Sequence, residues 1–204
     1  MDKKEQEKLN KELIKYAKDG NLKFVKYLVE NGANIHANDD RSLIGSVNNG
    51  YLEVVKYLVE RGANIHAYNE EPLRLASYGG HLNIVKYLVK QDVDIHVNDD
   101  KSLRLASEKG NLEVVKYLVK NGANIHAKDD CALRWASERG RLKVVKYFLF
   151  DCLIQIKQET KDWLVEKNQH QTLNLIEKRD LLLKLDKDII QKDSINKLDK
   201  KIKI

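Results

Sequence analysis

The sequence has 204 residues and few of the residue types that stiffen, cross-link or anchor a chain. It contains one proline, which argues against a proline-rich linker. Two cysteines, Cys131 and Cys152, are too few for a disulfide framework, so we expect a reducing intracellular compartment. No apolar stretch approaches the roughly 20 residues that span a bilayer, and the N-terminus is too charged for a secretory signal. The sequence therefore predicts an intracellular protein that is neither secreted nor embedded in a membrane.

The excess of positive charge is also small. Lys and Arg number 37 and Asp and Glu number 31, giving a net charge of +6. This balance alone does not identify a nucleic-acid binder. The 42% of hydrophobic residues suffices for a sizeable core, in one domain or in an array of small units.

What the sequence has in abundance is internal repetition. A segment of the type GNLEVVKYLV begins at five glycines spaced 30 residues apart: Gly20, Gly50, Gly80, Gly110 and Gly140. A fold without repeats does not require such regular spacing. The sequence therefore predicts a solenoid, in which small units stack on their neighbours.

Each copy is predicted to contain two short helices. In the fourth copy the first helix covers residues 102–109, and Gly110 ends it because glycine readily adopts the left-handed conformation. The second helix covers residues 112–121 and carries an apolar stripe at helical spacing, formed by Leu112, Val115, Leu118 and Val119. Helices of about ten residues are marginal alone, so they are expected to pack on neighbouring copies.

The segments GHLNIVKYLV and GANI resemble ankyrin repeats, over residues 13 to about 150. The 30-residue period with KYLV and GANIHA is most similar to the ankyrin proteins of giant DNA viruses, which implies the cytoplasm, including that of a host cell. Ankyrin repeats usually have about 33 residues. Three are missing here between GANI and the next helix, where the family carries a hairpin finger, and the usual T-P-L-H start is replaced, for example by Lys101-Ser-Leu-Arg104. The resemblance implies an all-α ankyrin-type helical-repeat solenoid with shortened fingers.

The expected organisation is five helix pairs and a degenerate C-terminal capping pair. The solenoid is expected to span residues 1–186, followed by a charged tail at residues 187–204. Its repeats are placed at residues 13–30, 41–70, 71–100, 101–130 and 131–150, and the cap at residues 159–185. We expect the cap to cover the aromatic end of the fifth copy, 147–150, with four apolar side chains: Trp163, Leu164, Leu173 and Ile176.

Polar residues also recur at the repeat period, and most are interpreted as structural. The histidines His36, His66, His96 and His126 suggest metal binding, but stacked helices lie about 8–10 Å apart, too far for successive imidazoles to share one zinc ion. We expect these rings to bond neighbouring backbone instead. Acidic pairs at residues 39–40, 70–71, 99–100 and 129–130 precede the first helices and are expected to cap them.

Two columns of basic residues leave alternatives open. The arginines Arg74, Arg104 and Arg134 occupy the place of the family's buried histidine. They are expected to tie repeats together by meeting one acid of each pair, with an anion site as the alternative. The lysines Lys26, Lys56, Lys86, Lys116 and Lys146 are expected to form a solvated face, or else a weak basic stripe. Glu53 and Glu113 lie three residues before two of them and partly neutralise the column.

No catalytic motif is present in the sequence. It lacks G-x-x-x-x-G-K-[ST], G-x-S-x-G, H-E-x-x-H and C-x-x-C. Cys131 is interpreted as a free structural thiol, and Trp135 and Trp163 as packing residues. We therefore expect no enzymatic activity, no cofactor and no metal.

Function is expected where the copies differ. The resemblance implies that a partner binds at the finger tips and on the outer face of the first helices, which form a concave groove. The variable positions there are predicted to bind the partner: Arg41, Asn48, Asn49, Tyr51, Tyr68, Glu70, Tyr78, His81, Lys101, Glu108, Lys109, Lys128, Glu138, Arg139 and Arg141. Tyrosine is enriched in interaction hot spots, so Tyr51, Tyr68 and Tyr78 are the expected anchors.

The predicted function is a non-enzymatic protein-interaction module that binds an unidentified protein partner as a monomer. Membrane and nucleic-acid partners are not expected. One alternative is a weak binder of nucleic acid or an anionic surface through the lysine column. Another is an adaptor that recruits a partner to ubiquitin-ligase machinery, although residues 151–204 contain no proline and no L-P-x-E-type motif.

Overall fold

The structure is a computed structural model that describes residues 2–202, and the side chains of residues 2–187 and 189. All regular secondary structure in these residues is helical. The chain divides into two units whose boundary lies between Val144 and Val145.

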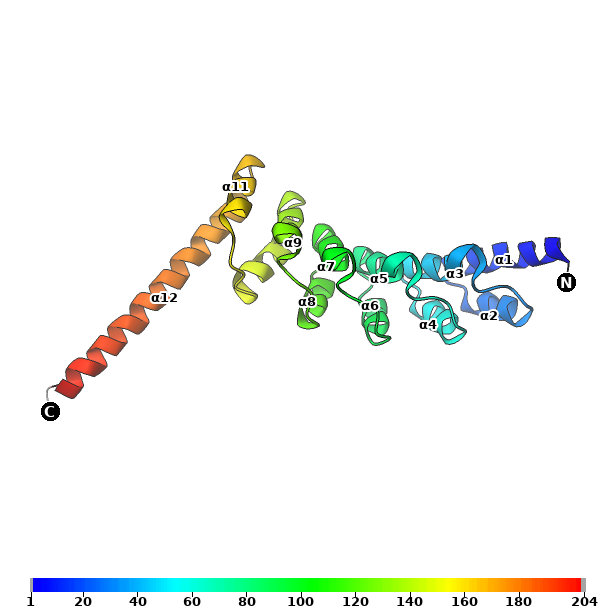
Figure 1. Cartoon of the computed structure of the whole chain (residues 1–204), viewed down its shortest axis with the longest axis horizontal. Helices are drawn as coiled ribbons and strands as arrows, with labels where there is room; N and C mark the ends of the chain where they lie inside the picture. Colours follow the sequence, from blue (N-terminus) through cyan, green and yellow to red (C-terminus); the bar gives the residue numbers. More distant parts are fainter. Residues whose placement is uncertain (1, 203–204) are drawn as a thin grey trace. The chain divides into compact units, whose positions relative to one another are not determined.

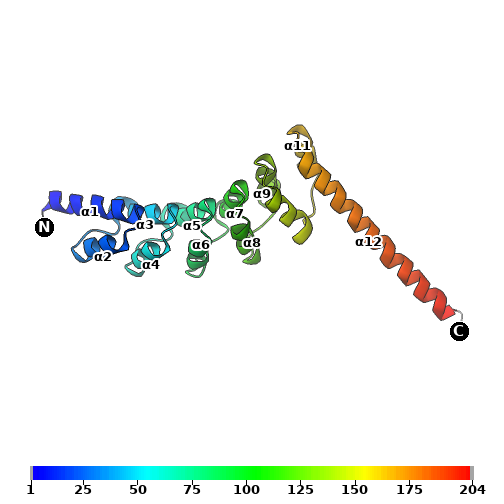
Figure 2. The same cartoon turned by 180° about the vertical axis from the view of Figure 1, so that it is seen from behind.

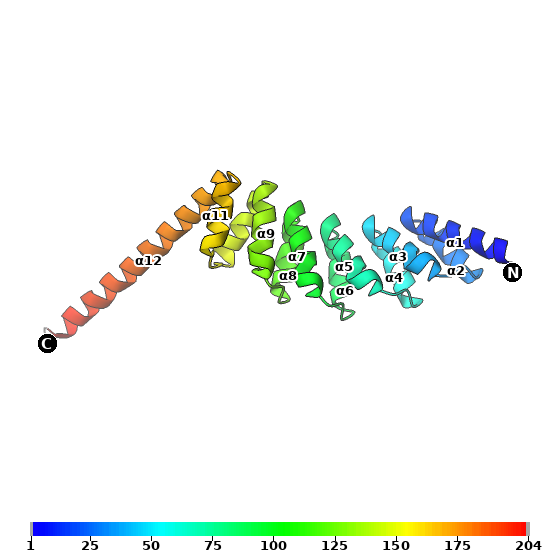
Figure 3. The ribbon, with the colours of Figure 1, turned by 45° about the horizontal axis from the view of Figure 1, so that its top comes forward.

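The first unit consists of two layers of helices (Figure 1). The first helices of the repeats pack side by side in chain order: α1 (Lys3–Lys18), α3 (Ala37–Asn48), α5 (Ala67–Gly79), α7 (Val97–Lys109) and α9 (Ala127–Glu138). The second helices form the other layer (Figure 3): α2 (Leu22–Glu30), α4 (Leu52–Glu60), α6 (Leu82–Val89) and α8 (Leu112–Lys120). This arrangement confirms the predicted helical-repeat solenoid.

The core of this unit repeats with the sequence. The leucines that the first helices direct between the two layers are completely buried: Leu43, Leu73, Leu103 and Leu133. The second helices contribute Val55, Val85 and Val115, also completely buried. Burying one such side chain contributes roughly 1.5–3 kcal/mol, so each short helix is stabilised by its neighbours. Glycine ends the helices as predicted: Gly110 has φ +80° after α7 and Gly122 has φ +97° after α8.

A three-residue left-handed turn opens each first helix from α3 to α9. In α7 the turn is formed by Asn98, Asp99 and Asp100, with φ of 55°, 56° and 54°, and the right-handed helix begins only at Lys101. Asn and Asp tolerate this conformation better than most other residues, which explains the polar, acidic composition of the segment. These turns take the place of the hairpin fingers, and residues 2–202 contain no strand.

The first repeat has its own N-terminal closure. The charged residues before residue 13 lengthen α1, which begins at Lys3. The Asn10 side-chain oxygen accepts a hydrogen bond from the Asn34 backbone N–H (2.8 Å), and the Gln6 amide donates to the Gly32 carbonyl (2.9 Å). The loop after α2 is thereby fixed to α1.

The second unit begins within the fifth copy, at Val145 of α10 (Leu142–Lys146). Helix α10 continues as a π-helical segment, η1 (Tyr147–Asp151), and α11 (Gln158–Glu166) and α12 (His170–Ile202) follow. Phe148 is buried in this unit, together with Leu164 and Ile176, and α12 packs on both α11 and η1. A helix pair is therefore present where one was predicted, but its second helix continues to Ile202 instead of ending near residue 185 (Figure 2). Its role as a cap of the repeats stays a prediction.

The second unit contains a buried arginine and a half-buried tyrosine, both with polar partners. The Arg179 guanidinium is 6% exposed and donates to the Ile154 carbonyl (2.7 Å) and to the Asp180 carboxylate (2.6 Å). Burial, followed by the hydrogen bond that the Tyr147 hydroxyl donates to Cys152, raises the pKa of Tyr147 to about 12. Tyr147 is half-buried, and it therefore stays neutral at physiological pH.

Candidate interaction surface

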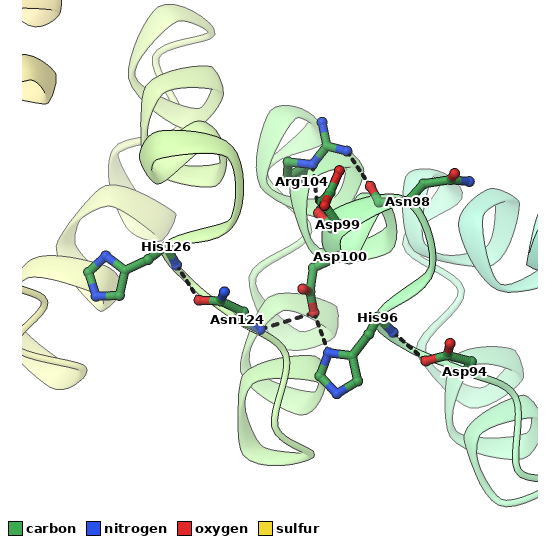
Figure 4. Close-up of polar contacts among 8 residues, drawn as sticks. All are labelled: Asp94, His96, Asn98, Asp99, Asp100, Arg104, Asn124 and His126. Carbon is green, nitrogen blue, oxygen red and sulfur yellow. Dashed lines mark hydrogen bonds and ion pairs between the residues drawn. The ribbon is translucent and has the colours of Figure 1, made fainter.

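The left-handed turns are held by a bond network that joins successive repeats (Figure 4). The Asp100 Oδ1 atom accepts a hydrogen bond from the Asn124 backbone N–H (3.0 Å), which lies in the next repeat, and contacts His96 Nδ1 (3.0 Å) in its own turn. The equivalent acid of the first turn does the same, since Asp40 accepts from the Asn64 N–H (2.9 Å). The buried carboxylates of Asp40 and Asp100 thus each satisfy a backbone donor of the next repeat.

This network corrects two sequence-based interpretations. The histidine rings do not bond neighbouring backbone but contact the acid at the last position of their own turn, at 2.6–3.0 Å in all four copies. The Asp40 and Asp100 carboxylates are engaged by the next repeat and do not cap their own helices. The acids recur because the left-handed turn favours Asp and because a buried acceptor is needed there. In the described part of the chain no group of three or more His, Cys, Asp or Glu side chains is arranged to hold a metal ion.

The arginine column also binds differently from the prediction. Arg104 donates to the carbonyls of Asn98 (2.7 Å) and Asp99 (3.0 Å), both in the turn of its own repeat. Arg74 and Arg134 donate to the corresponding carbonyls of residues 68 and 128. The arginines therefore stabilise the left-handed turns through backbone oxygen atoms. Arg104 also ties two repeats together, since it donates to Cys131 Sγ (3.9 Å) and lies 5.4 Å from the Trp135 ring centroid.

Most of the residues predicted to bind a partner lie on the exposed surface of the first helices and turns. The exposed ones are Arg41, Asn48, Asn49, Tyr51, Tyr68, Tyr78, Lys109, Lys128, Glu138, Arg139 and Arg141, and His81, Lys101 and Glu108 are half-buried. Glu70 is the exception, since it is 7% exposed and contacts His66 Nδ1 (2.8 Å). Glu70 therefore belongs to the internal bonding of its turn and not to the surface.

The residues that follow the helix-ending glycines do more than line this surface. His81 lies 3.1 Å from the Asn48 carbonyl, the Asn111 amide donates to the carbonyls of Ser77 and Tyr78 (both 2.9 Å), and Arg141 donates to the Glu108 carbonyl (3.0 Å). Each side chain reaches the C-terminal end of the preceding first helix, where carbonyls lack partners within the helix. The residue type after the helix-ending glycine therefore affects two things: the bonds between adjacent repeats and the chemistry of the exposed surface.

Two tyrosines stand out from the first-helix layer. Tyr68 is 53% exposed and its hydroxyl donates to Asp39 Oδ2 (2.8 Å), which is the main cause that raises the pKa of this phenol. Tyr78 is 41% exposed, and Lys109 Nζ lies 4.2 Å from its ring centroid. Both rings are oriented by a neighbouring repeat while one face stays open to solvent.

The next repeats along the layer carry paired charges and one tryptophan. Lys128 pairs with Asp99 (3.3 Å) and Arg139 with Glu108 (3.2 Å). Lys101 Nζ lies 4.7 Å from the Trp135 ring, and burial, followed by the charge of Arg104, lowers the pKa of Lys101. Trp135 is thus held between cations of the preceding repeat, where cation–π attraction fixes it.

The lysine column lies on the second helices. Lys26, Lys86, Lys116 and Lys146 are exposed and Lys56 is half-buried. Lys56 and Lys116 are paired with Glu53 (2.8 Å) and Glu113 (3.0 Å), as the i, i+3 spacing predicts. This face is therefore a solvated surface whose positive charge is partly neutralised.

Comparison with known families identifies the chain. The family model described as ankyrin repeats (3 copies) matches residues 3–69, 43–129 and 73–162, and the chain therefore belongs to the ankyrin-repeat family. Such repeats are generally protein-interaction modules and typically have no enzymatic activity. Comparison with curated proteins finds no match. Within residues 2–202, none of the helices combines the length and the apolar content needed to cross a membrane.

Proposed function

We propose that this chain is a non-enzymatic module that binds a protein partner through the exposed surface of its first helices and turns. The observation that carries the proposal is the pair of exposed tyrosines, Tyr68 and Tyr78, among mainly polar and charged side chains, with Tyr51 exposed as well. Large aromatic rings held by their neighbours are typical anchors of protein interfaces, because little conformational entropy is lost when they are buried. An intracellular location, a monomeric state and the similarity to viral ankyrin proteins, all expected from the sequence, belong to this proposal.

The lysine column supports a nucleic-acid partner less well. Contacts with phosphate need free cations, whereas Lys56 and Lys116 already pair with carboxylates on the same helix face. A gel-shift titration at two salt concentrations tests this alternative. Retardation of nucleic acid that weakens steeply with salt would favour it over a protein partner.

The proposal is tested by replacing both tyrosines with alanine. The full chain, its Tyr68→Ala/Tyr78→Ala variant and a Tyr27→Ala control are immobilised, and the proteins each retains from lysate are quantified. Tyr27 is 58% exposed but lies on α2 in the second layer, so it matches the exposure without the position. We expect the double variant to lose about tenfold or more of the specifically retained partner, while the control retains it.

Circular dichroism melts of the same three proteins separate binding from folding. The double variant loses one exposed hydrogen bond and one exposed ring contact, which is expected to cost at most about 1 kcal/mol. A partner retained equally by all three proteins would contradict the proposed surface. A large loss of stability would show that the rings act in the core.

A further inference from the structure

A hollow of about 360 Å³ opens in the first-helix layer around Gly45 of α3. Its apolar lining includes Ile14 of α1 and Leu75 of α5, and its charged rim is formed by Lys18, Arg41 and Glu71. All of these residues lie in the first unit, on three successive first helices. The volume is at the lower end of the range for pockets that bind small ligands, about 300–1,000 Å³, and suits a side chain better than a folded surface.

The hollow exists because the first complete repeat departs from the others at two adjoining positions. Where this repeat has Gly45, the following copies have Leu75, Leu105 and Trp135. Where the following copies have an arginine that folds back onto its turn, this repeat has Ile44, which is 5% exposed. Gly45 leaves space where the other copies have a bulky side chain, and Ile44 gives this space an apolar wall.

The charges at the rim favour one kind of occupant. Neither Lys18 nor Arg41 forms an ion pair with a described residue, and the one carboxylate of the rim, Glu71, is likewise unpaired. Because the rim has two cations and one anion, it attracts a carboxylate of a partner to the side where Lys18 of α1 and Arg41 of α3 lie. Tyr68 is close by, since the charges of both Glu71 and Arg41 act on its hydroxyl.

We propose that this hollow binds an aliphatic side chain of an extended protein segment that carries a carboxylate beside it. The aliphatic group fills the space over Gly45, and the neighbouring Asp or Glu meets Lys18 and Arg41. The exposed Asn48 amide, which lines the hollow and bonds no described residue, is available to the backbone of the segment. This inference rests on the proposed function, because it specifies the partner of the same surface.

The test uses a displayed library of random twelve-residue peptides as the probe and the full chain as the bait. We expect the enriched peptides to share Leu, Ile, Val or Met within two positions of Asp or Glu. Their affinities are then measured by fluorescence anisotropy against Gly45→Leu, which places the side chain of the next copy in the hollow. A Cβ atom at this position would meet Lys18 Cβ at 3.4 Å, an ordinary contact, so the variant is expected to fold.

Two further variants serve as matched controls. Gly45→Ala leaves most of the hollow open, and Leu105→Trp makes an equivalent change in the same column two repeats away. We expect Gly45→Leu and Arg41→Glu each to weaken the peptides about tenfold or more, and the two controls to change affinity less than about threefold. The Gly45→Leu variant should melt at or above the temperature of the unaltered chain, because it also removes a glycine from a helix interior.

Each outcome decides between the two proposals. Peptides that bind Gly45→Leu as tightly as the unaltered chain, or that lack the aliphatic and acidic pair, overturn the inference. If those peptides nevertheless bind the Tyr68→Ala/Tyr78→Ala variant more weakly than the unaltered chain, the proposed interaction surface is supported and only the role of the hollow is rejected. A selection that enriches no peptide, or only peptides indifferent to all of these changes, overturns the inference, while the proposed function is decided by whether the Tyr68→Ala/Tyr78→Ala variant still retains a protein partner.

Discussion

The joint between α7 and α9 and the joint between α5 and α7 are built from the same positions but bonded differently. In the first, Asp100 accepts from the Asn124 N–H and contacts His96. In the second, Glu70 contacts His66 through one oxygen, while its Oε2 atom is buried without a hydrogen-bond partner and makes no bond to the Asp94 N–H. One additional methylene group has removed this bond between the turns, although the Asn111 amide still joins the same two repeats through the Ser77 and Tyr78 carbonyls (both 2.9 Å). The comparison teaches that sequence identity of the helices does not make the joints equal, because a few buried polar atoms determine each one.

The loop after α6, next to the joint between α5 and α7, also has a residue that is poorly suited to its backbone conformation. Asp92 adopts φ +58°, at the place where Gly62 and Gly122 end the corresponding helices. The left-handed conformation costs a residue with a Cβ atom roughly 1–2 kcal/mol, somewhat less for Asp. The third repeat therefore carries backbone strain next to a missing bond.

The largest expected effect comes from removing the acid at each joint. Asp100→Ala removes the charged acceptor of the part-buried Asn124 N–H and the contact with His96, and is expected to destabilise the protein by about 2–3 kcal/mol. Glu70→Ala removes one contact and one unbonded oxygen atom, and is expected to cost about 1 kcal/mol or less. Urea unfolding followed by circular dichroism measures both, and each variant serves as the control of the other because both place alanine in a left-handed turn. Equal losses would contradict the difference between the joints.

A smaller effect is expected from relieving the strained loop. Asp92→Gly should raise the free energy of unfolding by about 1 kcal/mol, because glycine adopts the left-handed conformation without the steric penalty. The reverse change, Gly122→Asp, has open space around the new Cβ atom and should cost about the same. An unchanged or lowered melting midpoint for Asp92→Gly would show that this turn is not strained.

The smallest effect is expected from restoring the acid found in the other copies. Glu70→Asp removes the unbonded oxygen and supplies a side chain that tolerates the left-handed turn better. We expect a gain of about 0.5 kcal/mol in the free energy of unfolding, measured by the same urea titration. Asp100→Glu, the opposite exchange at the stronger joint, should be destabilising. A gain in that variant would disprove the explanation based on side-chain length.

The helices could be predicted from the sequence because their determinants are local. Apolar spacing within ten residues and glycine at each helix end were sufficient to place α7 and α8 to within a few residues. The turn at Asn98–Asp100 could not be predicted in the same way, since Asp before a helix is compatible with a cap and with a left-handed residue. The target of Arg104 depends on which carbonyls that turn exposes. The hollow around Gly45 depends on three helices that meet only in the fold.

The missing bond at Glu70 has a mechanical consequence for the repeats. A linear stack transmits tension from one repeat to the next, so it parts first at the joint with the least resistance. At the level of the turns the missing bond lies between α1–α6 and α7–α9, while the Asn111 amide still joins these two groups at the helix ends. Under load the turns would separate first at this joint, with Tyr68 and Tyr78 on one side of it and Trp135 on the other.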